Sequence, residues 1–188
     1  MGFLTSLFGS TRTRQTTANN PLRLNDPTLG FLNLMGESGE ALMEIDANVL
    51  SPLFTRTLKS TTTAPSCQVL FIYCELDAEG HIKGHRDMPT DLVKAAQAYV
   101  AVIASENSGA SYIKAVKPRK DWHANVTMVL DRKGDKLARF FQKVFAGMFA
   151  GRSMLILWVE LAPQGPGPWQ AEAPGTILAA MAGHITFG

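Results

Sequence analysis

The chain has 188 residues, 46% of them hydrophobic, and a formal net charge of +2. That length suits one domain with an extension rather than two domains, and about 150 folded residues can bury a core without disulfides or metals. So small a charge excludes any argument for nucleic-acid or membrane binding from composition alone. No apolar run reaches the roughly 18 residues that a membrane-spanning helix requires.

The N-terminal residues 1–35 are predicted to form a flexible arm, followed by a single domain over residues 36–188. Residues 9–20 are almost all polar, so they cannot offset the entropy cost of becoming ordered. The apolar tip before them has the helical spacing that suits docking on a partner or on the protein itself. This arm tip consists of Phe3, Leu4, Leu7 and Phe8.

The next part of the chain is predicted to hold short helical pieces and then a strand. Residues 40–58 have a helical spacing of apolar side chains that Pro52 interrupts, which favours two short helical pieces. Val69–Leu76 is rich in β-branched and aromatic residues and too short for a helix, so we predict a buried strand. The turn residues from Asp77 to Gly80 then indicate a hairpin.

The remaining segments are predicted to be two helices and three strands. Apolar spacing predicts helices over Thr90–Ser105 and Asp135–Ala150, and the second has a continuous aromatic and aliphatic face. Ala110–Val116 and His123–Leu130 are predicted to be antiparallel strands, because a loop of only six residues joins them. The apolar run Met154–Leu161 is predicted to be a strand, and the Pro- and Gly-rich residues after it an extended cover.

This order of strand, helix, strand, strand, helix and strand is that of a ferredoxin-like split β-α-β arrangement. We therefore predict an α+β fold of this kind, with an added N-terminal hairpin or helical segment and the C-terminal cover. The alternative is a doubly wound α/β sheet, whose parallel strands need crossovers of a dozen or more residues. Only six residues separate Val116 from His123, which disfavours that alternative.

The two cysteines, Cys67 and Cys74, lie seven residues apart around the first predicted strand. At about 3.3 Å per residue they are roughly 23 Å apart, whereas a disulfide requires Cα atoms within about 7 Å. They cannot pair with each other, so we predict reduced thiols and a cytoplasmic protein.

Four residues are candidate metal ligands, because a Zn²⁺ site needs three or four converging side chains of these types. They are Asp77, His81, His85 and His123. In an extended segment His81 and His85 would lie roughly 13 Å apart, too far to share one ion. The chain also has no nucleophile elbow, phosphate loop or dinucleotide fingerprint. The sequence thus favours a non-enzymatic protein without a cofactor, and a metal-assisted hydrolase built on these four residues is the alternative.

The segment from Lys114 to Lys143 holds nine basic and three acidic residues, which gives a local charge of +6. This charge indicates a second alternative, a nucleic-acid-binding surface. However, no Gly-Phe-Gly-Phe motif of RNA-binding sheets accompanies it, and a solvated helix face also explains such a stripe. The candidate residues are Lys117, Arg119, Lys120, Arg132, Lys136, Arg139 and Lys143.

The function that the sequence favours is that of an interaction or assembly module acting through its surfaces. The reason is the arm tip, because an apolar segment on a polar tether is suited to binding in a groove of a partner. We expect a protein partner or self-association, with nucleic acid as the alternative partner at the basic segment.

Overall fold

The computed structural model describes residues 21–115, 124–161 and 175–188. The strands are β1 (Leu22–Leu24), β2 (Leu29–Asn33), β3 (Thr57–Ser60), β4 (Val69–Tyr73), β5 (Val100–Glu106), β6 (Asn125–Asp131), β7 (Gly175–Ala180) and β8 (Ile185–Phe187). The helices are α1 (Glu37–Leu50), the 3₁₀ turn η1 (Ser51–Leu53), α2 (Pro89–Ala96), α3 (Gly109–Ala115), α4 (Lys136–Phe149) and α5 (Met154–Leu161). Within this described part, none of the helices combines the length and apolar character needed to cross a membrane.

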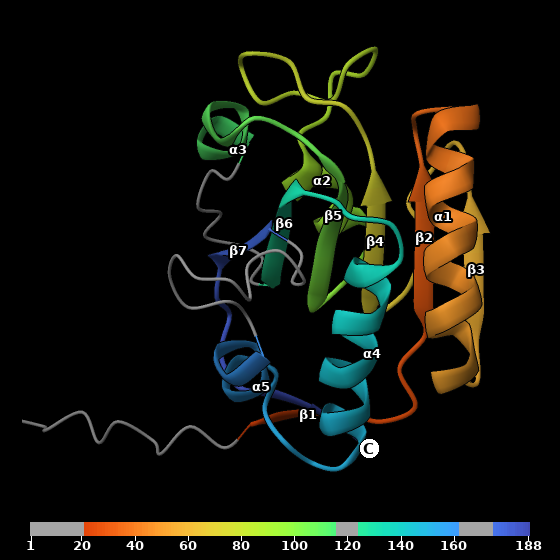
Figure 1. The fold of residues 1–188 in the computed structure, drawn as a ribbon, viewed down its shortest axis with the longest axis vertical. Helices are drawn as coiled ribbons and strands as arrows, with labels where there is room; N and C mark the ends of the chain where they lie inside the picture. Colours follow the sequence, from red (N-terminus) through yellow and green to blue (C-terminus); the bar gives the residue numbers. More distant parts are fainter. Residues whose placement is uncertain (1–20, 116–123, 162–174) are drawn as a thin grey trace, which may run out of the picture.

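The centre of the fold is a six-stranded sheet in the order β3, β2, β4, β5, β6, β7 (Figure 1). Neighbouring strands from β3 to β6 are parallel, whereas β7 is antiparallel to β6. A separate small sheet pairs β1 with β8. The chain runs outward from β2 to β3 on one side, then returns to β4 and continues through β5 and β6 on the other.

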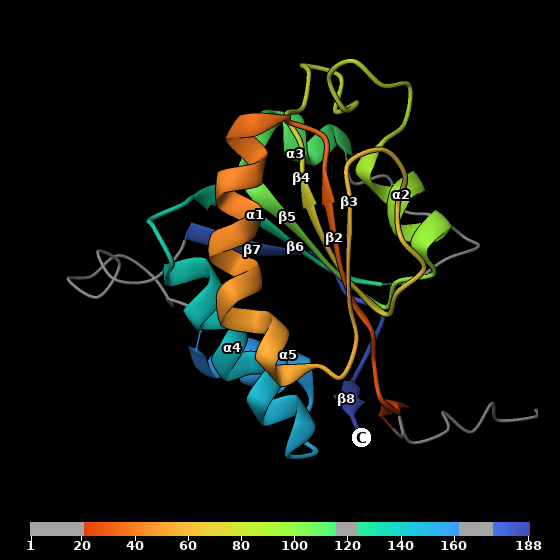
Figure 2. The same cartoon turned by 90° about the vertical axis from the view of Figure 1, so that its right-hand side faces the viewer.

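Helices cover both faces of this sheet. Figure 2 shows α1 and α4 on one side of the sheet and α2 on the other. On the α1 and α4 side, Phe71 of β4 contacts Phe141 and Phe145 of α4. On the opposite face, Leu70 and Ile72 belong to a second core with residues of α2 and α3. All residues of β4 are therefore buried, as in the central strands of covered parallel sheets.

The predicted combination of helices with a mixed sheet is confirmed, whereas the ferredoxin-like detail is not. Parallel neighbours joined through helices correspond to the doubly wound alternative, with an antiparallel edge strand added. Of the predicted N-terminal hairpin or helical segment, the helical form is present as α1, which joins the parallel strands β2 and β3. The predicted C-terminal cover falls largely in residues 162–174, outside the described residues, and β7 and β8 follow it.

Two predicted strands are wrong, because both segments are helices. Ala110–Val116 lies largely within α3, which begins where the Ser108 hydroxyl accepts the N–H of Ser111 at 3.1 Å. The connection from β5 to β6 therefore includes α3. It is longer than the six-residue loop between Val116 and His123 that the sequence prediction used. Met154–Leu161 is α5, since the place beside β6 is occupied by β7 and the apolar run packs on α4 and β8 instead.

Two predicted helices are only partly right. Thr90–Ser105 overlaps α2, but this helix ends at Ala96, and Gln97 has a φ of 58°. The β-branched run after it forms β5, because it pairs with β4 and β6 on both sides. In residues 40–58, α1 ends before Pro52 as predicted, but the last part of the segment is strand β3.

The predicted boundary between arm and domain lies too late in the chain. β2 pairs with both β3 and β4, and all its residues are buried. β1 pairs with the last strand of the chain. Residues from at least Leu22 onward thus belong to the fold, while residues 1–20 lie outside the described residues.

Three predicted elements are confirmed by the structure. Val69–Leu76 contains β4, His123–Leu130 overlaps β6, and Asp135–Ala150 contains α4. The predicted apolar face of α4 forms much of the core, with these residues buried: Leu137, Phe140, Phe141, Val144, Phe145 and Met148. Long elements with one apolar face are thus predictable from their periodicity.

Replacing Phe145 with alanine should destabilise the protein by about 3 to 5 kcal/mol, because the ring is fully buried. The ring lies 5.4 to 6.2 Å, centroid to centroid, from Phe54, Phe71, Phe141 and Phe187. Urea and thermal unfolding measure the loss. The control is Lys143→Ala on the exposed side of α4, expected to cost less than about 0.5 kcal/mol. Equal stability of the two variants would contradict the assigned core.

Candidate functional site

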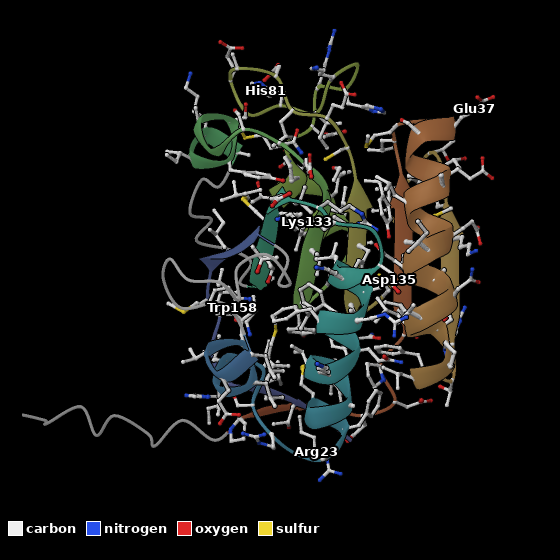
Figure 3. The ribbon with its side chains drawn as sticks, viewed as in Figure 1. Arg23, Glu37, His81, Lys133, Asp135 and Trp158 are labelled. Carbon is white, nitrogen blue, oxygen red and sulfur yellow. The ribbon has the colours of Figure 1, made fainter. Side chains whose placement is uncertain are left out.

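The main candidate site is a cleft at the carboxyl ends of the parallel strands. It has a volume of about 650 Å³ and is lined by residues that follow β2, β4, β5 and β6, and by α1. Figure 3 shows Glu37 at the start of α1 and His81 in the loop after β4 at this end of the sheet. The cleft lies beside the point between β2 and β4 where the direction of winding reverses, and open parallel sheets commonly bind ligands there.

The rim of the cleft beside β2 is a tight turn into α1. The Asn33 amide nitrogen donates to the Gly36 carbonyl at 2.8 Å, and its oxygen accepts the Met35 N–H at 2.9 Å. A Cβ on Gly39 would lie 2.0 Å from the same oxygen, so only glycine fits. The first turn of α1 carries Glu37 and Glu40, which disfavour an anion at this helix end.

The cleft opens where β4 and β5 separate. Their paired positions end at Ile72 and Ile103, and side chains then replace the backbone ladder. The Ser105 hydroxyl accepts the N–H of Cys74 at 3.0 Å. The Asn107 side chain accepts the N–H of Leu76 at 2.7 Å and donates to the Cys74 carbonyl at 3.1 Å. These bonds satisfy buried backbone groups while the strands diverge.

Tyr112 anchors α3 to the same end of the sheet. Its hydroxyl lies 2.8 Å from the carbonyl oxygens of both Ser105 and Val129. Burial raises the pKa of Tyr112 well above its ordinary value, so the hydroxyl stays protonated and remains a donor. The turn between β5 and α3, which lines the cleft, is therefore held in place by β5 and β6 together.

A buried ion pair lies beside the cleft. Arg132, just after β6, donates from Nη2 to Asp46 Oδ1 at 2.7 Å and from Nη1 to Oδ2 at 3.0 Å. The Tyr73 hydroxyl donates to the same Oδ2 at 2.7 Å. Nη1 also donates to the Ala104 carbonyl at 2.7 Å. The Asp46 side chain is fully buried and that of Arg132 is 4% exposed, so α1, β4, β5 and the end of β6 meet at one charge pair.

The electrostatics of this pair follow from its burial. Burial raises the pKa of Asp46, and the guanidinium of Arg132 and the Tyr73 hydroxyl oppose that rise by stabilising the carboxylate. Burial and the neighbouring Asp46 raise the pKa of Tyr73, so the phenol stays protonated and donates. The Nε–H of Arg132 is buried and has no hydrogen-bond partner among the described residues.

The cleft has one apolar wall and one polar wall. Leu42 and Ile45 of α1 form the apolar wall, and Asn107, Ser108 and Ser111 form the polar wall. Leu42 and Ile45 are two of the apolar side chains with helical spacing in residues 40–58. The buried residues of α1 include Met43, Asp46, Ala47 and Leu50, whereas Leu42 and Ile45 border the cleft.

Both cations of the lining are paired with carboxylates. Lys83 Nζ lies 2.8 Å from Glu75 Oε2, and the guanidinium of Arg132 is bound to the carboxylate of Asp46. The carboxylate of Glu106 accepts the backbone N–H of Arg132. The described lining therefore offers a phosphate no cation without a carboxylate partner, and its two acidic and two basic side chains give it no net charge.

The predicted metal ligands are only partly brought together. Asp77 and His81 lie in the loop after β4, where Asp77 Oδ1 accepts the N–H groups of Glu79 and His81 at 2.9 and 2.8 Å. His81 Nδ1 is 3.8 Å from Asp77 Oδ2. His85 lies in the same loop, and His123 is outside the described residues. Among the described residues no three His, Cys, Asp or Glu side chains converge on a metal position.

The predicted basic surface loses one of its members. Arg132 is buried in its bond to Asp46, so it is not available to a surface phosphate. Arg139 Nε lies 2.6 Å from Asp135 Oδ2, while Lys143 is exposed on α4. Lys136 is also on α4 and is half-buried. The remaining candidates and the arm tip lie outside the described residues, namely Lys117, Arg119, Lys120, Phe3, Leu4, Leu7 and Phe8.

The cysteines are both free and buried, in agreement with the prediction that they do not pair. Burial raises the pKa of Cys67 and of Cys74 to about 12. Thiols with so high a pKa remain protonated near neutral pH, and a protonated thiol is a poor nucleophile. Their role is that of small apolar side chains in the second core.

Sequence reasoning missed the residues that shape the cleft. Asp46 carried a signal, because it falls on the buried face of α1 with Met43 and Ala47, and a charge there requires a buried partner. Arg132 and Asn107 each follow a strand of the parallel part of the sheet. Both line the same cleft only because of the order of these strands.

Comparison with known proteins found no match to a protein-family model, to a curated protein or to a solved structure. No family is assigned to the chain on that basis. A function for it must therefore be inferred from the geometry of the cleft and of the described surfaces.

Breaking the ion pair from either side should cost about 3 to 5 kcal/mol, because the remaining charge stays buried without its partner. The single variants are Asp46→Leu and Arg132→Met. The double variant should cost clearly less than their sum, since it removes both charges together. Urea unfolding of the four proteins measures the coupling. Additive losses would contradict a direct interaction between these two side chains.

Proposed function

We propose that this protein binds a small polar molecule without net negative charge in the cleft at the carboxyl ends of β2, β4, β5 and β6. The observation that supports this most is the position of the cleft beside the winding reversal, where open parallel sheets commonly bind ligands. Its volume of about 650 Å³ falls within the range of about 300 to 1,000 Å³ of small-molecule sites.

The two walls indicate the chemistry of the ligand. Leu42 and Ile45 offer a surface for a flat apolar face, and Asn107, Ser108 and Ser111 offer hydrogen-bonding groups opposite it. A neutral heterocycle with several donors and acceptors fits both walls, and nucleosides are probes of this chemistry.

Binding is tested on the full chain with adenosine and uridine and with their 5′-monophosphates, by saturation-transfer NMR and calorimetry. At least one nucleoside should bind, and its monophosphate should bind more weakly, because both lining cations are paired and Glu106 lies in the cleft. Ile45→Arg should reduce nucleoside affinity by about ten-fold or more, since it fills the cleft from α1.

The matched control is Ile113→Arg, which changes an isoleucine that is 82% exposed on α3 and does not line the cleft. It should leave nucleoside binding unchanged. Binding that survives Ile45→Arg would place the site elsewhere. Tighter binding of the monophosphates would contradict the charge argument, and no binding of any of the four probes would rule out this ligand class.

A second candidate function is that of an interaction module in which the arm tip is the docking element. It is supported by exposed apolar side chains on α5, where Ile156 is 47% and Val159 is 54% exposed. Adjacent exposed apolar residues on a helix commonly form a docking surface. The arm is taken from here on as residues 1–20, and Pro21, which directly follows them, lines the same hollow as Ile156.

A full-chain variant with both Phe3→Ser and Leu7→Ser should bind more anilinonaphthalene sulfonate than the wild type. A docked tip covers apolar surface, so its removal uncovers a site for the dye, whereas loss of an undocked tip would lower dye binding. The difference should persist from low to moderate salt, because the contact is apolar. Thr5→Ser, within the same segment, is the control and should leave dye fluorescence unchanged.

A further inference from the structure

The exposed side of α5 is an apolar surface without a covering element among the described residues. Met154 and Leu157 turn into the core, and Ile156 and Val159 lie on the exposed side, three residues apart. We call this side, together with the adjoining hollow, the α5 surface. The hollow has a volume of about 450 Å³ and is lined by Pro21, Arg152, Ser153, Ile156 and His184, among others.

The polar groups of the α5 surface are engaged with one another. Arg152 donates to both carboxylate oxygens of Glu160 at 2.6 and 2.7 Å. The Ser153 hydroxyl and His184 Nδ1 lie 2.7 Å apart. These pairs leave the apolar groups of Ile156 and Val159 as the part of the surface that gains most from being covered.

The arm leaves the fold beside this surface. Pro21 is the first described residue and lines the hollow together with Ile156. The twelve residues 9–20 connect it to the tip, and a flexible chain of that length has a root-mean-square extension of about 19 Å. α5 has eight residues and is thus about 12 Å long, so the tip can reach all of its exposed side.

The same tether favours the protein's own tip over that of another molecule. A short flexible connection gives a local concentration in the millimolar range, well above the micromolar concentration of a second copy. The tip is also chemically suited, because the spacing of Phe3, Leu4, Leu7 and Phe8 in the sequence is the one that places apolar side chains on one side of a helix.

We infer that the arm tip docks on the α5 surface of its own chain, with its apolar side against Ile156 and Val159. This inference rests on the second candidate function, that of the arm as a docking element, and is independent of ligand binding in the cleft. A partner that binds either the tip or the α5 surface would have to displace the other.

The test is photo-crosslinking of the full chain with p-benzoylphenylalanine in place of Phe3, at low micromolar protein concentration. Mass spectrometry should find the cross-link on α5 within the monomer. Ile156→Asp should lower the yield by about five-fold or more, because a buried carboxylate opposes the apolar contact. Since Ile156 is 47% exposed, its substitution should leave the circular dichroism and melting temperature close to those of the wild type.

Ile113→Asp is the matched control, on an isoleucine that is 82% exposed on α3, and should leave the yield unchanged. Cross-links on other elements, or a yield that Ile156→Asp does not lower, would overturn the inference. Cross-links only between chains would overturn docking on the same chain while supporting the arm as an assembly element. Absence of any cross-link would contradict both the inference and the second candidate function.

Discussion

The buried ion pair between Asp46 and Arg132 is the interaction on which the carboxyl end of the sheet depends. It joins α1 to the segment after β6, and through Tyr73 and the Ala104 carbonyl it also holds β4 and β5. Burying two charges is costly, and the cost is offset only because the carboxylate and guanidinium meet in bidentate geometry with further hydrogen bonds. Without this pair α1 would lose its buried polar anchor above the sheet, and the apolar wall of the cleft would lose its position.

The cleft itself follows from how the parallel strands end. β4 and β5 stop pairing after Ile72 and Ile103, and the side chains of Ser105 and Asn107 then bind the backbone of the diverging strand. A gap between strands is tolerable in a protein interior only if its polar groups are satisfied, and here side chains satisfy them. The site is therefore rigid on its sheet side, where Tyr112 adds further bonds to Ser105 and Val129. Preformed geometry of this kind favours binding because little order has to be gained.

The two ends of the molecule serve different proposed roles. The carboxyl end of the sheet has the cleft, with a polar and an apolar wall. The other end has α5 and β1 (Figure 1), and Pro21, directly before β1, lines the hollow beside α5. Because the cleft and the α5 surface share none of their lining residues, ligand binding and arm docking can be tested independently.

The sequence by itself determined the strand β4, the helix α4 and the free state of both cysteines, because composition and periodicity within a short segment decide each of these. It did not determine α3 or α5, since a short apolar run fits a helix and a buried strand equally well. Neighbours decided both: the Ser108 cap for α3, and the occupation of the place beside β6 by β7 for α5. The cleft was likewise beyond sequence reasoning. Asp46 and Arg132 are 86 residues apart, and only the parallel order of the sheet brings such distant residues to one edge.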